Sequence, residues 1–158
     1  MHSNSTSLDA TSISIAALYH SDTALARGID NSPPQSLLPN LQRLQSGLAA
    51  IQILLGSPIS ISSGYRCDEL NRAVGGVPGS QHQEGLAADF ECQGFGSPID
   101  IAQTIFKSAL EFDQMIVEFG RWVHISFSPT PRRQTLTIYS SATGYLDGIV
   151  TPDGHRLA

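Results

Sequence analysis

Residues 80–90 of this 158-residue chain read SQHQEGLAADF, a segment that joins a polar turn to an alternating strand. Gly85 permits a turn after His82, and apolar side chains then alternate with small or polar ones as far as Phe90. Alternation of this kind is typical of a half-buried strand. Asp89 therefore projects from the face of the strand opposite the apolar one.

A second segment, residues 122–127, reads WVHISF and shows the same alternation. Val123 and Ile125 point to one face, and His124 points to the other. If the two strands are neighbours in the matching register, Asp89 and His124 lie on one wall.

His82, Asp89 and His124 together make a complete ligand set for one zinc ion. Zinc binds imidazole nitrogens and carboxylate oxygens, and a catalytic site supplies three protein ligands while leaving the fourth position to water. A lone strand histidine is more often a hydrogen-bonded structural residue, and a lone aspartate is more often a cap or turn residue. The combination of the three favours a zinc site with one ion per chain.

Three segments together resemble a known family, namely SSGYR (62–66), residues 80–89 and WVHIS (122–126). In order and separation they are similar to the zinc D-Ala-D-Ala carboxypeptidases, whose relatives include vancomycin-resistance dipeptidases, phage endolysin peptidases and the hedgehog signalling domain. The resemblance covers about 59–127. It implies a zinc metallopeptidase that hydrolyses a peptide bond in peptidoglycan stem peptides.

A zinc peptidase also needs a carboxylate that takes a proton from the attacking water and passes it to the leaving amine. Glu118 is our choice, because it ends an apolar strand and the turn that follows folds the chain back toward His124. Its spacing to that histidine looks like that of the hedgehog domain. Some peptidases of the group place the acid three residues before the last histidine, where this chain has Arg121. Glu84 and Asp113 are the rival bases.

Arg66 is the second catalytic candidate and a candidate substrate ligand. In the resembling peptidases the arginine of this Gly-Tyr-Arg element donates to the substrate carbonyl or carboxylate, a task suited to a planar, always-charged group. Its alternative role is to cap a helix or pair with a surface acid. Ser80 is a further substrate-binding candidate, although a serine beside a glycine-rich turn often has only a turn role.

Cys67 and Cys92 are the only cysteines. They could form a disulfide, but two cysteines in a protein made in the cytoplasm are more often free thiols. Because Cys67 follows Arg66 directly, its thiolate is a minor alternative ligand.

The remaining pattern predicts an α+β fold, an antiparallel sheet covered by helices, with zinc at its open end. Short helical turns are expected within 13–27, and the apolar spacing predicts a helix over 37–55 that ends at Gly56. Further helices are expected at 68–73 and 98–110, with a glycine-rich loop at 74–83.

The expected strands are 59–63, 86–90, 114–118, 122–126 and 134–139, and residues 140–158 could add an edge strand. Residues 1–12 are expected to be frayed, and 13–158 to form one domain.

Composition agrees with a small globular enzyme. The chain is 41% apolar and 15% charged, and its net charge of −5 without a basic run argues against nucleic acid as a partner. It has no apolar stretch long enough for a membrane span and no recognisable Sec signal. We therefore expect a soluble monomer made in the cytoplasm that acts on the cell wall after release by another route, as phage endolysins do.

Two other classes of function remain open at this point. One is a hedgehog-like module that binds zinc without catalysis, and the other is a structural phage component. The bond cleaved is also open, because carboxypeptidase, dipeptidase and endopeptidase action can all use this ligand set.

Overall fold

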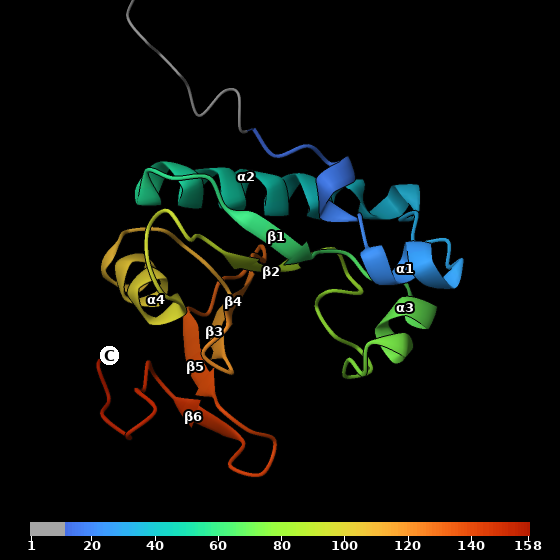
Figure 1. Cartoon of the computed structure of the whole chain (residues 1–158). Coiled ribbons are helices and arrows are strands. Elements are labelled where there is room, and N and C mark those ends of the chain that lie inside the picture. Colours follow the sequence, from blue (N-terminus) through green and yellow to red (C-terminus); the bar gives the residue numbers. More distant parts are fainter. Residues whose placement is uncertain (1–11) are drawn as a thin grey trace, which may run out of the picture.

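The computed structural model describes residues 12–158, so the expectation for the first twelve residues falls almost wholly outside it. Six strands form one sheet in the order β1-β2-β4-β3-β5-β6 (Figure 1). Their bounds are β1 (Ser60–Ser63), β2 (Ala87–Glu91), β3 (Gln114–Glu118), β4 (Trp122–Ser126), β5 (Gln134–Ile138) and β6 (Tyr145–Asp147). The predicted α+β class and five predicted strands are confirmed, and the C-terminal segment supplies the edge strand β6.

The helices also follow the predicted pattern. They are α1 (Asp22–Arg27), α2 (Leu38–Leu55), α3 (Asp68–Ala73) and α4 (Pro98–Lys107), with short 3₁₀ turns at η2 (Ala16–Leu18) and η3 (Gln35–Leu37). Gly56 ends α2 in a left-handed conformation, with φ of 66°. A Ser97 capping box begins α4, which ends at Lys107, earlier than predicted, because Ser108 is extended. Within residues 12–158, no helix has the length and apolarity to cross a membrane.

The two faces of the sheet have different surroundings. Apolar side chains on one face pack with those of α2 and α4 in the main core, which includes Phe90, Met115, Val117, Val123 and Ile125. Every second residue of the same strands points the other way, and there the sheet forms the floor of a cavity. The strand alternation therefore separates a buried core face from a functional face.

The sheet is mixed, which corrects the expectation of a purely antiparallel sheet. Strands β3 and β5 pair in parallel, with Gln114 opposite Gln134 and Ile116 opposite Leu136. The cause lies in the short connection after β4. Strand β4 ends beside the start of β3, with Ser126 opposite Gln114. A short loop then places the start of β5 at that same end of β3. Strand β5 therefore runs parallel to β3.

Strands β2 and β4 are antiparallel neighbours, and their register sets the site. Asp89 pairs with His124, and Ala87 pairs with Ser126. The sequence-based expectation that these strands lie side by side in matching register is confirmed. The turns before β2 bring His82 over the same face, and Gly85 takes a φ of 71° in that segment.

Candidate metal centre

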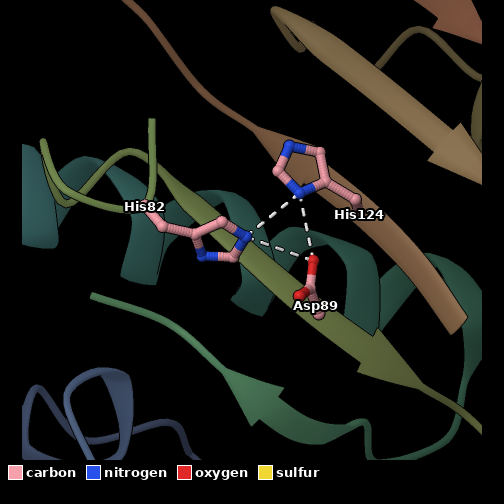
Figure 2. A group of neighbouring side chains, drawn as sticks. All are labelled: His82, Asp89 and His124. Atoms are coloured by element: carbon pink, nitrogen blue, oxygen red, sulfur yellow. Dashed lines mark hydrogen bonds and ion pairs between the residues drawn. The ribbon is translucent and has the colours of Figure 1, made fainter. Parts of the chain in front are cut away.

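Three buried side chains converge on the open face of the sheet (Figure 2). His82 comes from the loop before β2, Asp89 from β2 and His124 from β4. One donor atom of each lies within 4.8 Å of the others, and among residues 12–158 this is the group that could hold a metal ion. The structure thus brings together the three residues predicted as ligands.

The separations of these donor atoms suit a tetrahedral ion. Asp89 Oδ1 lies 3.0 Å from His124 Nδ1 and 3.3 Å from His82 Nε2, and the two nitrogens are 3.2 Å apart. Zinc–ligand bonds of about 2.0–2.1 Å in a tetrahedron place ligand atoms about 3.3–3.4 Å apart. The triangle therefore needs little adjustment to accept zinc, and two imidazole nitrogens with one carboxylate oxygen are donors that zinc prefers.

The orientation of His82 is fixed from outside the group. Its Nδ1 lies 2.8 Å from the Gly64 carbonyl oxygen, which can only accept a hydrogen bond. Nδ1 must therefore carry the proton, and in the neutral ring Nε2 presents its lone pair to Asp89 and His124. A hydrogen bond from the second ring nitrogen to a carbonyl is the usual way in which proteins orient a metal-binding histidine.

Asp89 is held as a carboxylate. Burial alone would raise its pKa, but the interactions of its carboxylate with His124 and His82 outweigh that effect and lower the pKa well below its ordinary value. Arg66 Nη2 lies 3.3 Å from Asp89 Oδ2, the oxygen turned away from the histidine pair. The carboxylate is therefore ionised and oriented for binding a cation.

Arg66 has three partners on this side of the site. Its Nε donates to Ser63 Oγ at 2.9 Å and its Nη1 to Asn71 Oδ1 at 3.3 Å, besides the contact with Asp89. Burial lowers the pKa of Arg66, and the charges of Asp89 and Glu118 oppose that shift. The guanidinium is thus held in one orientation while it lines the cavity.

Glu118 lies at the edge of the metal group, the name used from here on for His82, Asp89 and His124. Its Oε1 is 3.9 Å from His124 Nδ1, and its Oε2 accepts a hydrogen bond from Trp122 Nε1 at 3.1 Å. Burial raises the pKa of Glu118, and the negative charge of Asp89 raises it further, although His124, Trp122 and Arg66 act in the opposite direction. A carboxylate with a raised pKa accepts a proton more readily.

One cavity of about 680 Å³ contains the metal group, Arg66, Ser80 and Glu118. Ser80 Oγ also accepts a hydrogen bond from the His82 backbone, which is turn chemistry. The rival bases lie elsewhere, because Glu84 is exposed outside the cavity and Asp113 is paired with Arg132. Of the three predicted carboxylates, Glu118 is the one that lines the cavity.

The cysteines do not join the metal group. Cys67 and Cys92 are free thiols, and the Cys67 sulfur accepts a hydrogen bond from the Leu70 amide at the start of α3. The minor alternative of a cysteine ligand has no support in the geometry of residues 12–158.

Sequence reasoning missed several residues of the cavity. The Gly64 carbonyl, the Trp122 indole, Arg132 and Tyr145 all contribute to the site or its walls. For Gly64 the sequence held a hint, because it lies inside the SSGYR segment. Arg132 and Tyr145 lie in no recognisable motif, so only the fold brings them to the cavity.

Comparison with known proteins gives one result. A family model described as Peptidase M15 matches residues 11–126, almost three quarters of the chain, and this range contains the three residues of the metal group, Arg66 and Glu118. A comparison with curated proteins found no match.

Proposed function

The chain belongs to the peptidase M15 family, the family of the zinc D-Ala-D-Ala carboxypeptidases, and on that premise we propose that it is a zinc-dependent peptidase. Its substrate is a peptide bond in the stem peptides of peptidoglycan. The observation that carries the proposal is the buried triangle of His82, Asp89 and His124 beside Glu118 in one cavity. The domain that carries this function spans 13–158.

The proposed roles follow from the contacts. His82, Asp89 and His124 hold the metal ion, with Gly64 and Arg66 orienting the first two of them. When bound, zinc would polarise the scissile carbonyl and lower the pKa of a water molecule.

Glu118 takes the proton from the attacking water and gives it to the leaving amine. The Trp122 indole holds one of its carboxylate oxygens, so the other is directed toward His124. A general base has to lie within hydrogen-bonding reach of its proton, directly or through one water, and this orientation suits that task.

Arg66 stabilises the oxyanion that forms on the substrate carbonyl, or binds a substrate carboxylate. Its contacts with Ser63 and Asn71 keep its planar group in place before the substrate arrives. Donors fixed in advance stabilise a developing charge without the cost of reorientation. Ser80, on the loop before His82, is a further substrate-binding candidate in the same cavity.

Mass spectrometry of purified peptidoglycan and of synthetic stem peptides after digestion tests the proposal. The zinc-loaded protein is expected to release new amino and carboxyl termini at one bond. Chelator-treated protein is the control, and activity should return when zinc is restored. A zinc-loaded protein that cleaves no stem peptide of any connectivity would contradict the enzyme, and would favour a non-catalytic zinc-binding module or a structural phage component.

A further inference from the structure

Arg132 lines the same cavity as the metal group, but it lies beyond the residues matched by the family. It is in the loop between β4 and β5, and its side chain is 56% exposed. Nothing in the proposed chemistry uses it. A charged side chain at the wall of a substrate cavity is a candidate for recognising the substrate.

The Arg132 guanidinium is fixed in place by a buried carboxylate. Nε and Nη2 donate to the two oxygens of Asp113, each at 2.9 Å, and the Arg132 backbone amide donates to Asp113 Oδ1 at 3.2 Å. The Asp113 side chain is only 4% exposed, and Gln81 also donates to it at 2.8 Å. This two-bond pairing gives Arg132 one orientation before any ligand binds.

Part of the guanidinium remains available. Asp113 accepts from Nε and Nη2, and among residues 12–158 Nη1 donates no hydrogen bond. An arginine has five N–H donors, so this one can pair with Asp113 on one edge and still bind an anion on its outer edge.

Arg132 and Arg66 lie on opposite sides of the metal group. Arg66 contacts Ser63 of β1 and Asp89 of β2, whereas Arg132 is held beside the start of β3. In the sheet order β4, which carries His124, lies between β2 and β3. A peptide that crosses the metal group can therefore meet one arginine on each side of the bond that is cut.

The register gives the scale of this separation. Asp89, His124 and Ile116 form one row across β2, β4 and β3, and Asp113 lies three residues before Ile116. Three residues of strand extend about 10 Å. An extended peptide covers that distance in about three residues, so a substrate that ran along the strands from the metal group would reach the level of Asp113 within about three residues of the scissile bond.

Apolar side chains line other parts of the same cavity, and Phe119 and Tyr145 lie at the end of β3 away from Arg132. Val77, Phe119 and Tyr145 line the cavity and are 68%, 39% and 58% exposed. Exposed apolar groups around a few fixed polar groups are characteristic of ligand sites. The cavity thus suits a peptide that carries apolar side chains and a carboxylate.

We propose that Arg132 binds a free carboxylate of the stem peptide and makes this chain prefer substrates whose acidic residues are not amidated. The proposal rests on the peptidase function proposed above. A carboxamide has nearly the same shape as a carboxylate but no charge, so it loses the charge-assisted hydrogen bonds.

The test uses pairs of synthetic stem peptides that differ only by a carboxylate or a carboxamide, one pair for each acidic residue. Hydrolysis is measured on the zinc-loaded wild type. Binding is measured on the zinc-loaded Glu118→Gln variant through the fluorescence of Trp122, the only tryptophan of the chain, which lines the cavity. Binding therefore gives a result that does not depend on turnover.

For one pair, the carboxylate form should bind about tenfold or more tightly, and the preference should appear mainly in KM. Arg132→Gln should reduce the ratio of the affinities for the carboxylate and carboxamide peptides to about one. Arg132→Lys should retain part of the preference, because the positive charge remains. It should not retain all of it, because an ammonium group cannot bind Asp113 and the ligand at the same time as the planar guanidinium does. Arg43→Gln removes an equal charge from an exposed position on α2 and should leave the ratio unchanged.

An unchanged preference in both Arg132 variants would overturn the proposal, and so would the absence of any preference in the wild type. If the wild type hydrolyses none of the peptides, the peptidase function fails. The binding ratios still decide the role of Arg132 in that case, since they are measured separately from turnover.

Discussion

At the scale of single residues, the metal group is oriented by contacts outside itself. Gly64 fixes the proton on His82 Nδ1, and Arg66 holds the outer oxygen of Asp89. The donor atoms therefore face one another. Outer contacts of this kind typically change metal affinity by about 10- to 100-fold when they are lost.

Glu118→Gln tests the proposed base. Glutamine keeps the size of the side chain and can still accept the Trp122 hydrogen bond, but it cannot take a proton from water. We expect zinc content and Tm close to wild type, while kcat on a stem peptide falls by about two to four orders of magnitude. Full activity of this variant would mean that the base lies elsewhere.

Arg66→Lys tests the proposed oxyanion or carboxylate contact. Lysine keeps a positive charge near Asp89 but cannot donate to Ser63, Asn71 and a substrate at the same time. We expect a folded protein that retains zinc and loses about 10²-fold in kcat/KM. Wild-type turnover would leave Arg66 with a structural role only.

At the scale of elements, the site depends on strand alternation and on the helix behind the sheet. The alternation in β2 and β4 could be predicted, because side-chain direction along a strand is a local property. The same holds for α2, whose buried residues Leu41, Leu44 and Leu48 follow helical spacing. The parallel pairing of β3 and β5 was not predicted. It depends on which strand of the sheet still has an unpaired edge where β5 begins, and this is not a local property of the sequence.

Gly47→Ala tests the close packing of α2 on the end of β4. Alanine normally stabilises a helix relative to glycine, but a Cβ at position 47 would lie 2.4 Å from the Phe127 ring. We expect the free energy of unfolding to fall by about 1–3 kcal/mol. Ser46→Ala, exposed on the same helix, is the control and should change it by less than about 0.5 kcal/mol. Equal stability of the two variants in urea unfolding would contradict this packing.

At the scale of the whole molecule, the cavity combines residues that no single motif contains. The predicted ligands, base and Arg66 lie within the family match, and their motifs were sufficient to predict residues that the fold brings into one cavity. Arg132, in the loop between β4 and β5, and Tyr145, on β6, come from segments beyond that match. Their positions depend on the order of strands in the sheet, which the sequence pattern did not reveal.

Acid should weaken the whole fold through Asp113. Hydrogen bonds from Arg132 lower the pKa of Asp113 below its ordinary value, so the carboxylate form stabilises the folded state. This contribution is complete above the unfolded-state pKa of about 3.9 and is lost as the pH falls through the lower folded-state pKa. We expect Asp113→Asn to cost about 1–3 kcal/mol at pH 7 and progressively less below about pH 4. A difference from wild type that is independent of pH in urea unfolding would contradict this role.

The central claim is that His82, Asp89 and His124 hold one zinc ion, and the metal content of purified protein tests it most directly. Inductively coupled plasma mass spectrometry should find about one zinc per wild-type chain. His82→Ala, Asp89→Ala and His124→Ala should each retain far less, because three protein ligands leave none to spare. A wild type that takes up no zinc when it is supplied, or full zinc occupancy in His124→Ala, would contradict the account.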